Sequence, residues 1–185
     1  MADTTQTIRS FYDVAASREF SRDFLFRVLN ITFNRGTVFG ERDLVYLRAA
    51  KLPGRDITNV ASKYMGLAFN LPGGVTYPGS DSYELEFYCD ANSNIRQKLE
   101  AESRRTFDDA TSTGEYNIPT AASILTMVQL DKGLNAIDQY NLVGISIRNV
   151  GEIEYKIAEG TGEYVTFTST IAYHYFELVT PSEQT

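Results

Sequence analysis

The sequence predicts a mostly β protein, an antiparallel β-barrel or sandwich with one or two flanking α-helices. A chain of 185 residues suits a single domain. The 12 tyrosines and 11 phenylalanines, with no tryptophan, favour strands over helices. Several segments also alternate apolar and polar residues with the two-residue period of a half-buried strand.

Two segments are expected to be helical. The first covers about residues 5–17, where apolar residues recur at i, i+3, i+4 and i+7. The second covers about residues 91–105, with Asp90 as its expected N-cap and a narrow apolar stripe of Ile95 and Leu99. The apolar residues of the first segment are Ile8, Phe11, Tyr12 and Ala15.

Strands account for most of the remaining chain. The clearest alternation lies at 83–89, where Tyr83, Leu85 and Phe87 share one face, and at 163–177, which is expected to be one long strand. Segment 71–82 is rich in proline and glycine and is expected to be a functional loop. The expected strands, in order, are 24–33, 44–52, 57–70, 83–89, 123–130, 142–150, 153–158 and 163–177, of which 57–70 is expected to be either one long strand or a hairpin arm.

The composition argues against several classes of function. A net charge of −7 disfavours nucleic-acid binding, which depends on Lys and Arg contacts to phosphates. Cys89 is the only cysteine, so no intrachain disulfide and no cysteine-based zinc site is expected, as in a protein folded in a reducing cytoplasm. The N-terminus lacks the pattern of a signal peptide, and no apolar run is long enough to span a membrane. We expect no metal and no cofactor.

Catalysis is also disfavoured. His174 is the only histidine and lies within a threonine-rich strand, where a packed or interfacial role is more typical than that of a catalytic base. The carboxylate pairs are more typical of a solvated sheet face than of acid–base chemistry. An enzyme that uses them, and a β-barrel that binds a small apolar ligand, remain alternatives. The pairs are Glu84/Glu86, Asp108/Asp109 and Glu152/Glu154.

Because neither a catalytic site nor a metal site is expected, we expect the function of the protein to depend on its surfaces. Open sheet edges can pair with other chains, so self-association is the expected mode of action.

Four segments follow one another in a characteristic order along the chain. They are 19–28, 48–54 with its Leu-Pro turn, 85–90 followed by 95–99, and the C-terminal series 141–144, 150–153 and 165–177. Together they resemble the tail-tube proteins of contractile phages, which are related to the tubes of contractile injection systems. Segments 71–82 and 108–117 depart from the family pattern.

The resemblance implies a structural protein rather than an enzyme. Six copies would form a ring with sheets joined edge to edge, and rings would stack into a hollow tube that conducts DNA and is driven through the host envelope by a contracting sheath. The implied partners are further copies of the chain, a sheath protein, a baseplate or tube initiator, and a tape measure protein or DNA in the lumen. The implied location is the virion tail, assembled in the host cytoplasm. The inner tube of a secretion or extracellular injection system, or a tube-initiator paralogue, is the alternative.

The resemblance and the strand pattern together suggest two groups of functional residues. Alternating polar positions are candidates for the lumen lining, where acids would repel DNA: Glu84, Glu86, Thr166, Thr168 and Thr170. Apolar positions at the N-terminus and in 71–82 are candidates for contacts between subunits and rings: Ile8, Phe11, Tyr12, Leu71, Pro72, Val75, Tyr77 and Pro78.

Overall fold

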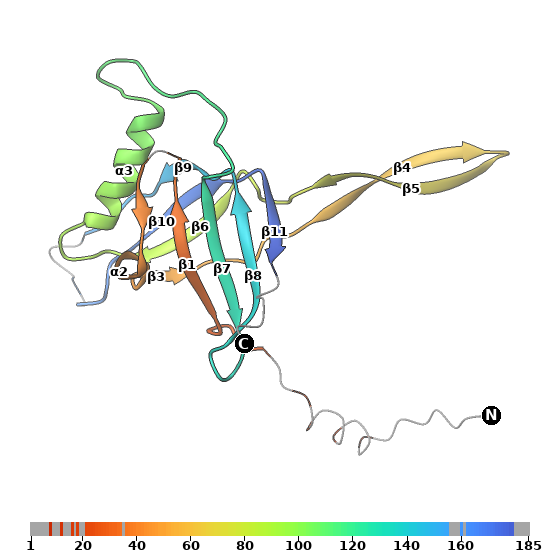
Figure 1. Cartoon of the computed structure of the whole chain (residues 1–185), viewed down its shortest axis with the longest axis horizontal. Helices are drawn as coiled ribbons and strands as arrows, with labels where there is room; N and C mark the ends of the chain where they lie inside the picture. The colour runs from red at the N-terminus through yellow and green to blue at the C-terminus, as the bar shows by residue number, and fades with distance from the viewer. Residues whose placement is uncertain are drawn as a thin grey trace.

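Two antiparallel sheets form the body of the molecule, and a third, two-stranded sheet projects from it as an arm (Figure 1). The strand order is β11-β8-β7-β1-β2 in the five-stranded sheet, β3-β6-β10-β9 in the four-stranded sheet and β4-β5 in the arm. This computed structural model describes residues 8, 12, 16, 18, 21–34, 36–155, 160 and 162–179.

The elements have the following bounds: β1 Phe26–Thr32, β2 Val38–Phe39, α2 Glu41–Leu44, β3 Leu47–Ala49, β4 Asp56–Tyr64, β5 Leu67–Thr76, β6 Tyr83–Tyr88, α3 Asn94–Thr106, β7 Ile124–Leu130, β8 Ala136–Val143, β9 Ser146–Val150, β10 Thr166–Ala172 and β11 Tyr175–Val179. The expected strands 24–33, 83–89 and 123–130 are confirmed as β1, β6 and β7, and segment 57–70 forms β4 and part of β5, as expected for a hairpin arm. The expected strand 44–52 is wrong at its start, because α2 ends at Leu44 and β3 has only three residues.

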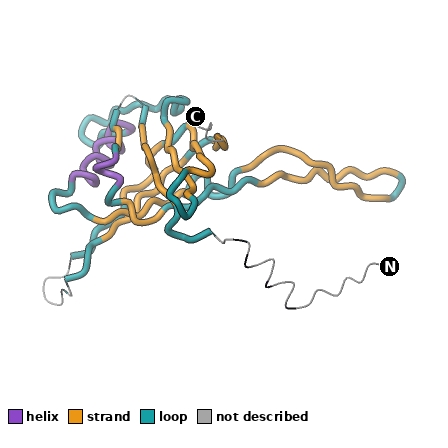
Figure 2. The backbone as a smooth tube through the Cα atoms, turned by 60° about the horizontal axis from the view of Figure 1, so that its bottom comes forward, coloured by secondary structure: helices purple, strands orange, loops and turns teal. Residues whose placement is uncertain are grey.

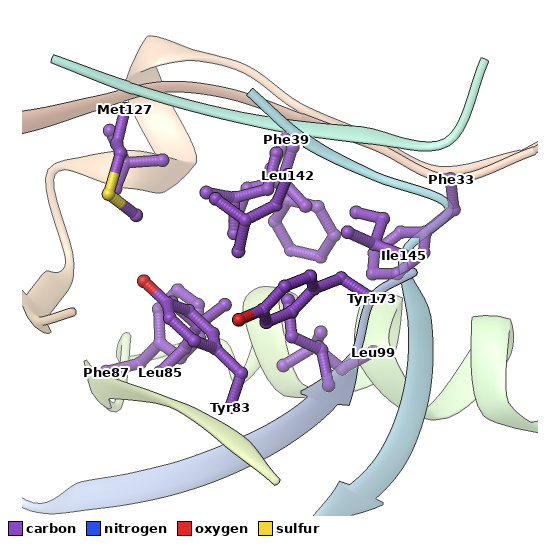
Figure 3. Packing of buried hydrophobic residues seen from close by; sticks show 14 of the residues in the cluster. Phe33, Phe39, Tyr83, Leu85, Phe87, Leu99, Met127, Leu142, Ile145 and Tyr173 are labelled. Carbon is purple, nitrogen blue, oxygen red and sulfur yellow. The ribbon is translucent and has the colours of Figure 1, made fainter. Parts of the chain in front are cut away.

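The core lies between the two sheets of the body, as expected for a sandwich. Figure 3 shows Met127 and Leu142 of the five-stranded sheet facing Tyr83 and Leu85 of the four-stranded sheet. The predicted inward face of β6 is confirmed, since Tyr83, Leu85 and Phe87 are all buried. The packing is close, as seen in the rings of Phe87 and Phe167, which stack with centroids 5.6 Å apart.

The chain crosses from one sheet to the other at two adjacent points. Segments 142–150 and 163–177 were each expected to be one strand, and both expectations are wrong. The first breaks at Gly144 between β8 and β9, and the second at Tyr173 and His174 between β10 and β11. Gly144 has a φ of +73°, and a Cβ there would lie 2.0 Å from the ring of His174. The two crossings therefore pack directly on each other, which requires glycine at this position.

Helix α3 closes one side of the sandwich beside β9, with Ile95 and Leu99 buried in the core as predicted. Asp90 does stabilise the helix N-terminus, because its carboxylate accepts the backbone N–H groups of Asn94 at 3.0 Å and Ile95 at 3.4 Å. The residue at the N-cap position is nevertheless Ser93, so the helix begins three residues later than expected.

The N-terminal helix expected at about 5–17 lies largely outside the described residues, Phe11 included. Ile8, Tyr12 and Ala16 have helical conformation and are exposed. Of the expected strand 153–158, residues 153–155 have no regular structure and the remainder lies outside the described residues.

Candidate assembly surfaces

The outward side of the four-stranded sheet, called the polar face below, collects the five predicted lumen residues. Strands β6 and β10 are antiparallel neighbours in a register that pairs Thr170 with Glu84 and Thr168 with Glu86. Thr166 continues the same row, two residues before Thr168. Because residues paired across strands share a face, all five lie together, on the side opposite the buried Phe87 and Phe167.

The acids of the polar face are paired with bases that the sequence analysis did not identify. Arg48 in β3 contacts Glu86 at 2.6 Å, and Lys51, just after β3, contacts Glu84 at 2.9 Å. The face therefore presents ion pairs beside a row of threonines. The sequence shows two basic residues in segment 48–51. It does not show that they pair with the acids of β6, because that pairing depends on the order of strands in the sheet.

A buried tyrosine holds Lys51 in place. The Tyr83 hydroxyl donates to the backbone carbonyl of Lys51 and accepts the backbone N–H of the same residue at 3.2 Å. Burial raises the pKa of Tyr83 well above its ordinary value, and burial likewise raises the pKa of Tyr173, whose ring lies 5.9 Å away. Both phenols therefore stay neutral, and the chain after β3 is anchored to the core.

The arm, residues 56–76, extends from the body as a two-stranded ribbon that turns at Met65 and Gly66 (Figure 2). Every residue of β4 and β5 is exposed. A two-stranded hairpin alone is marginally stable in water, so an arm of this length is expected to gain its order from a partner surface.

The register divides the outer part of the arm into an apolar and a polar side. On one side Tyr64 pairs with Leu67 and Val60 with Leu71, and between these pairs Phe69 lies opposite Ser62. The exposed fractions of the five apolar residues run from 47% for Phe69 to 69% for Tyr64. The other side consists of Asn59, Ala61, Lys63, Ala68, Asn70 and Pro72. We call the five apolar residues of the first side the apolar face of the arm.

The structure corrects the expectation that 71–82 is a loop, because β5 continues to Thr76. Pro72 is tolerated since a two-stranded ribbon has open edges on both sides. Gly73 and Gly74 form a bulge opposite Thr58, and a Cβ on Gly73 would lie 2.9 Å from the carbonyl oxygen of Thr58. The two glycines that suggested a loop therefore allow β5 to lie close to β4 at this bulge.

The remaining predicted contact residues are spread over the molecule. Leu71 and Val75 are exposed on the arm, and Pro78 is exposed beyond it. Tyr77 is half-buried against the chain's own core, with its ring 5.5 Å from that of Phe176. Ile8 and Tyr12 are exposed at the N-terminus.

Among the described residues, no group of three or more His, Cys, Asp or Glu side chains could hold a metal ion. His174 is exposed at the sheet crossing. No helix in the described part of the chain is long and apolar enough to cross a membrane. The pronounced surface features of the described part of the chain are the polar face, the open sheet edges and the arm.

Comparison with solved structures identifies the fold. A chain in the 6-fold symmetrised baseplate structure of the anti-feeding prophage matches with a TM-score of 0.62 and 13% identity, over 88% of this chain and 97% of that one. A chain in the structure of the anti-feeding prophage cap, which terminates its tube, matches with a TM-score of 0.60 and 12% identity, over 97% and 99%. A chain in the extended sheath–tube complex of the PVC extracellular contractile injection system matches with a TM-score of 0.53 and 9% identity, over 91% and 97%.

The chain therefore has the fold of these components of contractile injection systems, and the predicted tail-tube type of fold is confirmed. No family model matches the sequence. No curated protein matches it either.

Proposed function

We propose that this chain is a tube-type structural subunit of a contractile injection system, acting through assembly and not through catalysis. The observation that carries the proposal is the arm, whose apolar face is exposed along its whole length in the isolated chain. An exposed apolar ribbon that does not pack on the core of its own chain is typical of a binding surface for another molecule. The fold shared with components of such systems supports a further copy of the chain as that molecule.

The four-stranded sheet of the body supports a ring arrangement, because its edge strands β3 and β9 are free to pair with neighbouring copies. Six copies of the four-stranded sheet, joined edge to edge, would place about 24 strands around a channel. At about 4.8 Å between strands the circumference would be roughly 115 Å, which corresponds to about 37 Å between opposite backbones. The polar face would line this channel, with Glu84, Glu86 and the three threonines toward the lumen. The arm would contact the next ring, and Leu71, Pro72 and Val75 would be among its contact residues.

The lining differs from the strongly acidic one expected for a tube that repels DNA. Arg48 and Lys51 balance Glu86 and Glu84 one for one, so these four side chains carry no net charge. A lining of ion pairs and threonines offers few unpaired charges to either a nucleic acid or a protein. Such a channel suits polypeptide cargo at least as well as DNA.

The injection-system role is preferred over the phage virion because the similar solved chains come from injection systems. A phage tail tube would use the same ring, with a sheath outside and a tape measure protein or DNA inside. A position at the baseplate or tube end is the second candidate, since a baseplate structure and a tube-terminating cap are among the matches.

The test is negative-stain electron microscopy of the purified chain over a range of concentrations, beside its mass in solution. We expect sixfold rings or hollow tubes. The matched variant replaces residues 58–74 by Asn-Gly between Ile57 and Val75, which are paired in the native register and can close a short hairpin. This variant should remain folded and fail to form tubes.

A chain that stays monomeric at every concentration, also after addition of a baseplate fraction, would exclude the tube role. Normal tubes from the shortened-arm variant would exclude the arm as the contact between rings.

A further inference from the structure

A hollow of about 610 Å³ lies at one end of the polar face. It is lined by Tyr46, Tyr88, Cys89, Asp90, Ala91 and Tyr164, and we call it the tyrosine hollow. The rings of Tyr88 and Tyr164 meet edge to face with centroids 5.9 Å apart, and 88% of Tyr164 is exposed. Three aromatic side chains thus form an open apolar surface in the isolated chain.

The charged groups in and beside the tyrosine hollow are already engaged within the chain. The carboxylate of Asp90 accepts two backbone N–H groups at the start of α3. The Arg48 guanidinium lies 5.9 Å from the centroid of the Tyr88 ring and pairs with Glu86. What the hollow offers to a ligand is therefore mainly aromatic surface, which favours an apolar occupant.

The tyrosine hollow and the arm lie at opposite ends of the four-stranded sheet. The arm connects the C-terminal end of β3 to the N-terminal end of β6. Tyr46 directly precedes β3 and Tyr88 ends β6, so both lie at the other end of these strands. Tyr164 precedes β10, which runs antiparallel to β6 and pairs Thr166 with Tyr88. Figure 1 shows the arm leaving the body along the long axis of the molecule.

This placement suits head-to-tail stacking. When identical rings stack in one direction, the arm end of one copy meets the opposite end of a copy in the next ring. The nine residues of β4 span about 30 Å, enough to reach beyond the body of their own subunit. The five side chains of the apolar face are each about half exposed or more, and contiguous exposed apolar patches of a few hundred Å² mark interaction sites on soluble proteins.

We propose that the apolar face of the arm, around Leu67 and Phe69, docks into the tyrosine hollow of a second copy of this chain in the adjacent ring. This inference rests on the proposed function and adds the receiving surface. Each of the two surfaces is apolar and open in the single chain, and the stacking direction brings them together. Aromatic residues buried at the centre of such a contact carry a large share of its binding energy.

The only cysteine of the chain provides the test, because Cys89 lines the tyrosine hollow and is partly exposed. A Leu67→Cys variant places a second thiol on the apolar face. An Ala68→Cys variant places it one residue away on the polar side of the arm, as the matched control. Both are assembled at the same concentration, treated with a short bismaleimide and separated on denaturing gels, with parallel micrographs to record rings and tubes.

We expect Leu67→Cys to give crosslinked dimers and higher species at a yield at least several-fold above that of Ala68→Cys. The crosslinks should disappear when Cys89→Ser is added to Leu67→Cys. Assembled tubes without this crosslink, or equal yields from the two arm positions, would overturn the docking proposal and leave the tube role intact. Absence of any assembled species for the wild-type chain, also after addition of a baseplate fraction, would overturn both.

Discussion

The body and the arm are built from the same kind of paired strands with opposite results. In the body, β6 places Leu85 and Phe87 against a second sheet, and both side chains are almost completely buried. In the arm, β5 places Leu67 and Phe69 on one face in the same alternating pattern, and both remain exposed. Alternating apolar residues therefore stabilise the single chain in the body, whereas in the arm they remain exposed and available for contact with a partner.

The comparison has a consequence for mutations. Apolar residues of the body contribute to the free energy of unfolding of the single chain, because they leave water when the chain folds. Apolar residues of the arm remain in contact with water until assembly, so their contribution is to the free energy of association. Substitutions in the two regions are expected to separate these two quantities.

The largest expected effect on the single chain is that of Phe87→Ala. The side chain is fully buried and stacks on Phe167, so its removal should lower the free energy of unfolding by about 3–5 kcal/mol. Denaturant unfolding of the monomer measures this directly. The matched substitution Phe69→Ala in the arm should change the same quantity by no more than about 0.5 kcal/mol. Equal losses from both variants would show that the arm belongs to the folded core.

The next effect concerns association. Phe69→Ser removes an apolar side chain that is about half exposed in the single chain. Burial of that exposed part contributes about 1–1.5 kcal/mol per contact, which corresponds to a roughly tenfold higher concentration for assembly. Sedimentation of assembled material over a concentration series measures the shift, with Asn70→Ser on the polar side as control. An unchanged threshold would mean that this face binds no second copy.

The body was the more predictable region, because its strands obey a simple alternation. The pattern at Tyr83, Leu85 and Phe87 is sufficient to place β6 and its inner face. The sheet crossings were missed for a physical reason. At Gly144 and at His174 the chain changes sheets while its apolar residues continue without interruption, so the pattern shows no break. The only residue that indicates the turn between β8 and β9 is Gly144, which has a positive φ.

The arm was predicted up to Asn70, since segment 57–70 was expected to be one long strand or a hairpin arm. Its last part was missed, because Pro72, Gly73 and Gly74 are typical of loops and here belong to a strand with a bulge. Period two predicts that Glu84 and Glu86 share one face of their strand and that the three threonines share one face of theirs. That these two rows form one polar face depends on the pairing of β6 with β10. Its ion pairs depend on β3 lying beside β6, which is a contact between distant segments that no local pattern specifies.

A smaller effect is expected from the polar face. Glu86→Gln removes the acid that pairs with Arg48, but both side chains are partly exposed, so the loss in unfolding free energy should stay below about 1 kcal/mol. Its effect on the lining is a gain of one positive charge per subunit. If the polar face lines the channel, assembled tubes of this variant should retain more of a short anionic oligonucleotide than wild-type tubes, and the difference should decline with salt. Equal retention would place Glu86 away from the lumen.

The last effect, which is confined to the body and appears at alkaline pH, comes from the buried tyrosines. Burial raises the pKa of Tyr83 and Tyr173 above the ordinary value of 10.0, so the folded chain holds these protons more tightly than the unfolded chain does. The associated stability is fully present below pH 10 and declines as the pH rises above it, by up to about 1.4 kcal/mol per pH unit for each group. Denaturant unfolding between pH 8 and pH 11 measures the slope of the unfolding free energy against pH.

Tyr83→Phe should reduce this slope. At neutral pH the variant should also lose about 1 kcal/mol of unfolding free energy, because the contact with Lys51 is lost. Adding Tyr173→Phe should flatten the slope further. If the double variant and the wild-type chain lose stability equally above pH 10, the alkaline response arises outside the core between the two sheets.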